Sequence, residues 1–129
     1  MARRRLVSSG APWEATAGYS RAVVVGDQCW VAGTTDTGPD GTAAHPGDAG
    51  AQARAALSRI ERALTEAGFE LSEVVRTRMY VTDMARSAEV LAAHGQVFGA
   101  IRPAATIVEV GALIEPSLLV EIEADARHA

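Results

Sequence analysis

The stretch Arg102–Ala126 reads RPAATIVEVGALIEPSLLVEIEADA and contains two runs of alternating residues, joined by a short connection with Gly111 and Pro116. Successive side chains of a strand point to opposite faces of a sheet, so this alternation predicts a pair of strands. In the second run one set of residues is apolar, and the opposite set is Leu119, Glu121, Glu123 and Asp125. One face therefore suits a hydrophobic core, whereas the other carries carboxylates.

Outward from this stretch, hydrophobic spacing predicts the remaining elements. The expected strands are Leu6–Ser9, Ala22–Val25, Cys29–Thr34 and Val74–Val81, with a hairpin turn at Gly26, Asp27 and Gln28. The expected helices are Asp48–Ala67, with Asp48 as its N-cap and Gly68 at its end, and Ser87–Phe98. Glycine and proline around Trp13 and Tyr19 predict an irregular segment there.

After the short edge strand Leu6–Ser9, the elements follow the order strand, strand, helix, strand, helix, strand, strand, and two amphipathic helices can cover only one face of such a sheet. The residues expected on the uncovered face are Arg76, Arg78, Tyr80, Ala105, Ile107, Leu119, Glu121 and Glu123. A monomer seldom exposes a sheet face of this mixed character, so we expect self-association.

Composition narrows the possible classes of protein. The 129 residues predict one domain spanning 1–129, and no apolar run is long enough for a membrane span. Arg3, Arg4 and Arg5 have no apolar segment behind them and do not form a secretory signal. A single cysteine, Cys29, suits a reducing cytoplasm, and a net charge of -4 argues against a nucleic-acid partner.

The pattern Arg-Pro-Ala-x-Thr-x-Val-Glu-Val followed by Val-Glu-Ile-Glu-Ala resembles the C-terminal signature of the RidA/YjgF family, also labelled endoribonuclease L-PSP. Further matching segments are Ala17–Ala22, Val31–Thr34, Val75–Thr77 and Tyr80–Asp83. The resemblance implies an α+β, chorismate-mutase-like fold in which a mixed sheet carries two helices on one face. It also implies a homotrimer with pockets at the subunit junctions, and imine or enamine deaminase activity.

Carried over position by position, the resemblance implies that Glu121 handles the attacking water and that Tyr19 closes the pocket. The small residue and glycine of the family's pocket correspond to Ala32 and Gly33. The family's substrate-binding arginine is replaced by Ala105, and its usual cysteine by Ile107. A bidentate arginine–carboxylate contact contributes about 1.5–3 kcal/mol, so a standard amino-acid-derived imine is not the expected substrate.

Two residues of the uncovered face have alternative interpretations. Arg78 is a candidate replacement anchor for an anionic substrate, or it pairs with Glu121 or Glu123 to neutralise the interior of the trimer. Glu121 is either a proton-transfer group with a raised pKa or an ion-pair partner of Arg76 and Arg78.

Other chemically capable residues are assigned structural roles. His94 lies on the apolar stripe of its helix and is expected to be a hydrogen-bonded core residue, while Cys29 is expected in the core without a catalytic partner. Trp30 is expected to pack, and Trp13 to line the rim of the pocket. His45 falls in a loop and His128 at a frayed end, so no spacing suggests a metal site, and no cofactor is expected.

Three functions remain open from the sequence. The first is a hydrolase or tautomerase-like enzyme acting on a small reactive metabolite, with Glu121 as the proton-transfer group. The second is a non-catalytic trimer that binds a small apolar metabolite in a pocket made roomier by Ala105 and Ile107. The third, ribonuclease activity, ranks last because the chain is acidic and has no basic groove.

Overall fold

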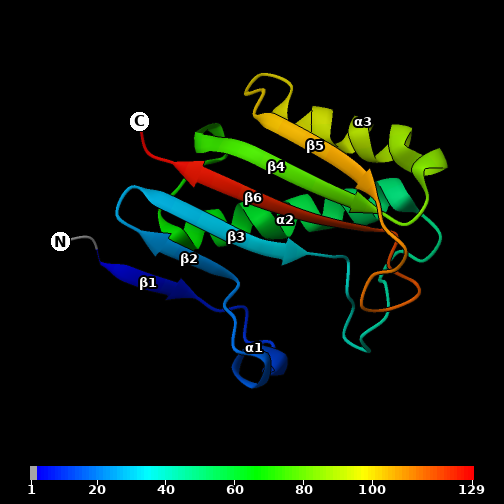
Figure 1. Ribbon diagram of the computed structural model, residues 1–129, viewed down its shortest axis with the longest axis horizontal. Coiled ribbons are helices and arrows are strands. Elements are labelled where there is room, and N and C mark those ends of the chain that lie inside the picture. Colours follow the sequence, from blue (N-terminus) through cyan, green and yellow to red (C-terminus); the bar gives the residue numbers. More distant parts are fainter. Residues whose placement is uncertain (1–2) are drawn as a thin grey trace.

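Six strands form one mixed sheet in the order β1-β2-β3-β6-β4-β5, as seen in a computed structural model that describes residues 3–129 (Figure 1). The strands are β1 (Arg4–Val7), β2 (Ala22–Val25), β3 (Gln28–Thr34), β4 (Val74–Val81), β5 (Ala104–Glu109) and β6 (Val120–Arg127). The α-helices are α1 (Pro12–Ala17), α2 (Ala49–Ala67) and α3 (Ser87–Phe98), with 3-10 turns η1 (Leu71–Glu73) and η2 (Met84–Arg86). This α+β arrangement confirms the expected fold class.

Helix α2 is the principal helix of the core and was predicted within one residue. The Asp48 carboxylate accepts a hydrogen bond from the Ala51 amide at 2.9 Å and so satisfies one of the free amides at the start of the helix. Gly68 ends the helix with a φ of 87°, which a glycine adopts without strain. The apolar stripe that includes Leu57, Ile60 and Leu64 is completely buried against the sheet.

The two strands of Arg102–Ala126 do not pair with each other. Strand β4 lies between them, antiparallel to β6 and parallel to β5. The parallel arrangement follows from the chain path, because α3 carries the chain from the end of β4 back to the start of β5. The hairpin of β2 and β3 forms as predicted, but its turn is shorter than expected, because Gln28 belongs to β3 and pairs with Val25.

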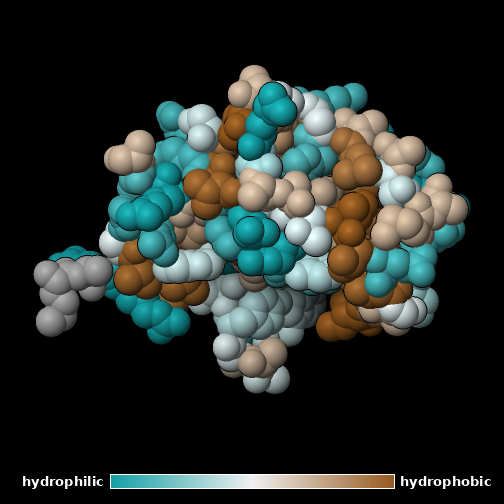
Figure 2. Space-filling view, turned by 45° about the horizontal axis from the view of Figure 1, so that its top comes forward, coloured by the Kyte–Doolittle hydropathy of each residue, from teal (hydrophilic) through white to brown (hydrophobic). Residues whose placement is uncertain are grey.

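Helices α2 and α3 lie on the same side of the sheet, and no helix formed by residues 3–129 covers the other side (Figure 1). We call this uncovered side the open face. It carries Arg78, Tyr80, Glu121 and Glu123, which alternate with the buried residues of β4 and β6. Figure 2, in which the β5 edge comes forward, shows hydrophobic groups interspersed with hydrophilic ones across this surface.

The predicted positions of Ala105 and Ile107 are wrong. The β4–β5 register pairs Thr77 with Ala105 and Met79 with Ile107. Thr77 and Met79 are buried on the helix-covered side, and Ile107 packs against the same core. Because laterally paired residues point to the same face of a sheet, Ala105 and Ile107 lie on the side opposite Glu121.

The segment around Trp13 is helical and not irregular. Pro12 occupies the start of α1, where a missing amide proton costs nothing, and Gly18 closes it with a φ of 79°. The glycine and proline therefore delimit a short helix. The N-terminal strand is also shifted, since β1 runs Arg4–Val7 where Leu6–Ser9 was expected. Within residues 3–129, no helix has the length and apolar character that crossing a bilayer requires.

Candidate functional site

The candidate site is built on an irregularity in β3. Val31 pairs with Ala124 of β6, but Thr34 pairs with Ile122, so two residues of β3 face one residue of β6. This is a β-bulge, and its two residues are Ala32 and Gly33. A Cβ atom on Gly33 would overlap the carboxylate of Glu121. The glycine therefore leaves the space in which the Glu121 side chain lies.

A cavity of about 1060 Å³ opens beside this bulge. Tyr19, Ala32, Gly33 and Glu121 all line it, so the structure brings together four residues singled out in the sequence. Trp13 also lines it, as predicted for the rim, together with Ile114. The size and the mixture of aromatic, apolar and a few charged side chains are those of a site for a small organic molecule.

Glu121 is half-buried, and its environment favours the protonated form. Burial raises the pKa of the carboxyl, and the negative charge of Glu123 raises it further, while the positive charge of Arg21 partly opposes both. The net pKa lies above that of an ordinary glutamate. A carboxyl of this kind keeps its proton to a higher pH, which suits it to exchange a proton with a bound substrate or water.

Arg21 also lines the cavity, and sequence reasoning assigned it no role. Its Nη2 group donates a hydrogen bond to the carbonyl oxygen of Gly33 at 2.5 Å, while the Ala32 amide donates to the carbonyl oxygen of Arg21 at 3.0 Å. Burial lowers the pKa of the guanidinium, but an arginine remains a cation near neutral pH. The only signal in the sequence was its place directly after Tyr19 and Ser20.

Helix α1 fixes the side of the cavity that carries Tyr19. The buried carboxylate of Glu14 accepts hydrogen bonds from the Ser8 hydroxyl at 2.9 Å and the Ser9 amide at 3.1 Å. The backbone carbonyl of Glu14 in turn accepts a hydrogen bond from the Tyr19 amide at 3.0 Å. These bonds hold Tyr19 at the wall of the cavity, where its side chain remains partly exposed.

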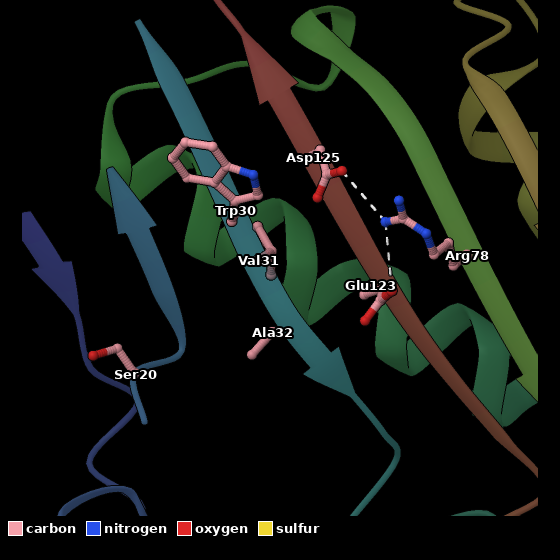
Figure 3. A pocket seen from close by; sticks show the side chains of 7 residues that line it. All are labelled: Ser20, Trp30, Val31, Ala32, Arg78, Glu123 and Asp125. Atoms are coloured by element: carbon pink, nitrogen blue, oxygen red, sulfur yellow. Dashed lines mark hydrogen bonds and ion pairs between the residues drawn. The ribbon is translucent and has the colours of Figure 1, made fainter. Parts of the chain in front are cut away.

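Arg78 lies in a different place, beside a shallow hollow of about 430 Å³ on the open face. Figure 3 shows its guanidinium turned toward Glu123 at 3.5 Å and Asp125 at 3.3 Å. The Tyr80 hydroxyl donates a further hydrogen bond to Glu123 at 2.9 Å. The observed partners of Arg78 are therefore Glu123 and Asp125 rather than Glu121.

Of two residues expected in the core, Cys29 is found there, whereas His94 is only partly buried but is hydrogen-bonded as expected. The His94 ring makes a hydrogen bond with the Thr77 hydroxyl at 2.8 Å, and burial lowers the pKa of its imidazole. Cys29 is completely buried, which raises the pKa of its thiol to about 11, and this excludes a reactive thiolate near neutral pH.

Two other residues, His128 and Trp30, differ from expectation, whereas His45 lies in a loop as expected. His128 is not frayed, because its ring stacks on Phe69 with the ring centroids 3.8 Å apart. Trp30 is not buried but is 41 % exposed on the open face. His45 is held by the buried carboxylate of Asp36 at 2.9 Å. No group of three metal-ligating side chains occurs in the described part of the chain, residues 3–129.

Comparison with known proteins gives consistent matches over most of the chain. The family model of Endoribonuclease L-PSP matches residues 9–128. An uncharacterized protein of Streptomyces coelicolor, SCO2049, is 35 % identical over 122 residues, which are 95 % of this chain and 90 % of that protein. The RutC family protein PH0854 of Pyrococcus horikoshii is 33 % identical over 108 residues, covering 84 % of this chain and 85 % of that protein.

Solved structures agree with this result. The crystal structure of Rv2704 from Mycobacterium tuberculosis, a member of the YjgF/YER057c/UK114 family, has a TM-score of 0.88 and 54 % identity, and the match covers 98 % of this chain and 100 % of that one. The crystal structure of the YjgF gene product of E. coli has a TM-score of 0.78 and 27 % identity, with coverage of 96 % and 94 %.

Proposed function

The chain belongs to the endoribonuclease L-PSP family, also called RidA/YjgF, and from this premise we propose that it hydrolyses a small imine or enamine compound. The observation that supports this function best is the Glu121 carboxyl lying over Gly33 in the cavity, with its pKa raised and Tyr19 at the wall. The substrate is a non-standard one, because Ala105 stands where the family's substrate-binding arginine is expected.

The reaction needs a positioned water and one group that exchanges protons. The protonated Glu121 carboxyl first donates its proton to the nitrogen of the neutral C=N bond, and as water adds to the carbon, the resulting carboxylate accepts the proton that the water loses. The same carboxyl then protonates the nitrogen again, and as the C–N bond breaks it takes back the proton of the new hydroxyl group, so that a carbonyl compound and ammonia leave. A positioned acid–base group of this kind accelerates a reaction by about a hundredfold to ten-thousandfold.

We further propose that the site is completed by assembly into a homotrimer. The open face carries half-exposed charged residues next to Trp30, which is 41 % exposed, and Val108, which is 39 % exposed. A second copy lying on this face would remove both side chains from water and close the mouth of the cavity. Closure would exclude bulk water and strengthen the electrostatic interactions inside.

The test is an assay of imine hydrolysis, using imines formed in situ by oxidation of several amino acids. We expect wild-type turnover of at least one of these compounds, and Glu121→Gln is expected to lower that turnover about a hundredfold or more. The matched control is Glu109→Gln, because Glu109 is a carboxylate of β5 outside the cavity. Equal turnover by wild type and Glu121→Gln would remove Glu121 from the mechanism.

A second candidate function is binding without turnover, favoured by the presence of Ala105 and Ile107 in place of the family's arginine and cysteine. Parallel ligand titrations and turnover assays of the wild type separate the two candidates, whereas Ala105→Arg does not, because Ala105 lies on the face of the sheet opposite Glu121 and outside the cavity. Saturable binding without turnover identifies a binding protein that has lost the reaction. Turnover in the wild type requires an anchor elsewhere. Ribonuclease activity is disfavoured, since none of the three histidines of the chain lines the cavity.

A further inference from the structure

We propose that Arg21 holds the acid group of the substrate, so that the natural ligand of the cavity is a small monoanion, most simply a carboxylate, next to Glu121. The inference rests on the proposed function for the identity of the site, but it concerns binding and not turnover. Four observations support it.

The first observation is that Arg21 and Glu121 meet at the same residue. The guanidinium of Arg21 is bonded to the Gly33 carbonyl oxygen, and the carboxyl of Glu121 lies where a side chain of Gly33 would be. Both groups line the cavity. An anion held by Arg21 would therefore place its adjoining carbon atoms within reach of Glu121, the arrangement that a positioned reaction requires.

The second observation is that Arg21 has no direct ion-pair partner, although Glu14 and Glu121 are near enough for their charges to act on it. Within residues 3–129, Arg21 forms no ion pair with any carboxylate. Its Nε–H group is buried and has no hydrogen-bond partner among these residues. Half-buried cations are usually paired, because removing a charge from water without compensation costs free energy. An unpaired one beside a cavity is suited to an anionic ligand.

The third observation is that the competing arginines are occupied or solvated. Arg59 donates to the carbonyl oxygens of Thr35 at 2.6 Å and Thr37 at 2.7 Å, so its guanidinium holds that loop. Arg62 lines the cavity but is exposed to water on α2. Arg78, the candidate from the sequence, is paired with Glu123 and Asp125 on the open face (Figure 3).

The fourth observation concerns the surroundings of the cavity. Its walls include Trp13, Tyr19 and Ile114, which offer apolar contacts to the remainder of a ligand. Of the other carboxylates that line it, Glu115 is turned toward Ser117, whose amide donates to it at 2.8 Å. The geometry thus combines the half-buried Arg21 cation, which has no ion-pair partner, with an aromatic wall, and this fits a compact anion with an apolar body.

The experiment compares two probes of the same shape and different charge, phenylacetate and phenylacetamide, by NMR titration of the wild-type protein near neutral pH. We expect phenylacetate to bind more tightly, with the largest shifts at Gly33 and neighbouring amides. In Arg21→Gln the affinity for phenylacetate is expected to fall about tenfold to a hundredfold, whereas the affinity for phenylacetamide is unchanged.

The matched control is Arg127→Gln, because Arg127 is an exposed arginine paired with Asp27 far from the cavity. It is expected to bind both probes as the wild type does. Arg21→Lys is a second variant that keeps the charge but not the fork of donors, and its affinity for phenylacetate is expected to be intermediate. This variant keeps the inference testable if Arg21→Gln does not fold.

Three results would overturn the inference: equal affinity of the wild type for the two probes, unchanged phenylacetate binding in Arg21→Gln, or loss of charge preference in Arg78→Gln alone. The outcome is distinguishable from failure of the proposed function. Charge-selective binding without Glu121-dependent turnover would leave Arg21 as an anchor in a binding protein. Glu121-dependent turnover without charge preference would retain the enzyme and remove the anchor.

Discussion

Gly33 and Glu121 depend on each other at the level of single atoms. The Glu121 carboxylate occupies the volume that any side chain at position 33 would need. We therefore predict that Gly33→Ala displaces the carboxylate while leaving its chemistry intact, and lowers turnover or ligand affinity about a hundredfold. The displaced group is the end of a flexible side chain that can move aside, so the free energy of unfolding should change little compared with the loss of turnover or affinity.

The control for this substitution is Gly111→Ala. A Cβ atom at Gly111 meets no other atom within 4 Å, and its backbone does not need the left-handed conformation. It tests the cost of adding a methyl group without displacing Glu121. Steady-state kinetics and urea unfolding of both variants provide the comparison. Equal activity of Gly33→Ala and wild type would mean that the position of the Glu121 carboxylate is unimportant.

Glu121 should also make stability depend on pH in a defined direction. Because the folded protein raises the pKa of this carboxyl, its contribution is most favourable when the group is protonated, and it is lost as the pH rises through the folded pKa. Glu121→Gln removes the cost of the buried charge. We predict that Glu121→Gln has a higher melting temperature than the wild type above neutral pH. Below the ordinary pKa of glutamate, near 4.5, the two proteins should have the same melting temperature. Thermal unfolding across this pH range is the measurement, and a constant difference would contradict it.

At the scale of elements, α2 supports the sheet and begins at a single side-chain cap. Loss of the Asp48 carboxylate leaves the Ala51 amide without its partner. We predict that Asp48→Ala lowers the free energy of unfolding by about 1 kcal/mol, whereas Asp48→Asn, which keeps an acceptor at the same place, changes it by much less. Chemical denaturation of the two variants decides the point, and equal stability would show that the cap contributes nothing.

Strand pairing is the other element-scale feature, and it decides which residues share a face. A strand that arrives by way of α3 must lie parallel to β4, so β5 is set at the edge of the sheet. Its register turns Ala105 and Ile107 toward the helix-covered side. Consequently, Ala105 and Ile107 do not line the cavity that holds Glu121.

At the scale of the whole molecule, a substitution on the open face tests whether the chain assembles into a homotrimer. Arg78 stands between Glu123 and Asp125, and its side chain is 39 % exposed in the single chain. A surface pair of this kind contributes about 0–1 kcal/mol, whereas removal of one partner from a covered pair costs about 3–5 kcal/mol. If a homotrimer covers this face, we predict that Arg78→Ala lowers stability by the larger amount and leaves phenylacetate affinity unchanged.

The measurements are sedimentation equilibrium, with urea unfolding at several protein concentrations. The control is Arg127→Ala, whose partner Asp27 is about half exposed, and which should cost little in any assembly. A trimer must also become more resistant to urea as its concentration rises. A monomeric mass, together with a small and concentration-independent effect of Arg78→Ala, would contradict the proposed assembly.

Most elements of this protein are determined by short-range patterns that the sequence displays. Period-3.6 and period-2 spacing of apolar residues predicted α2, α3 and β4 to within one residue, because these patterns reflect which side of each element is buried. Caps at Asp48 and Gly68 are likewise local. The uncovered face and its carboxylates also follow from the sequence, since alternate side chains of a strand point to the same side and Glu121 and Glu123 are two residues apart.

The tertiary structure alone decided the rest. The insertion of β4 between β6 and β5, and hence the true faces of Ala105 and Ile107, depends on pairing between distant segments, which alternation within one segment does not encode. The bulge that puts Gly33 under Glu121 is a mismatch between two strands and exists in neither alone. Arg21 precedes β2 without any periodic signal, and only the folding of β3 against β6 brings its charge to the cavity.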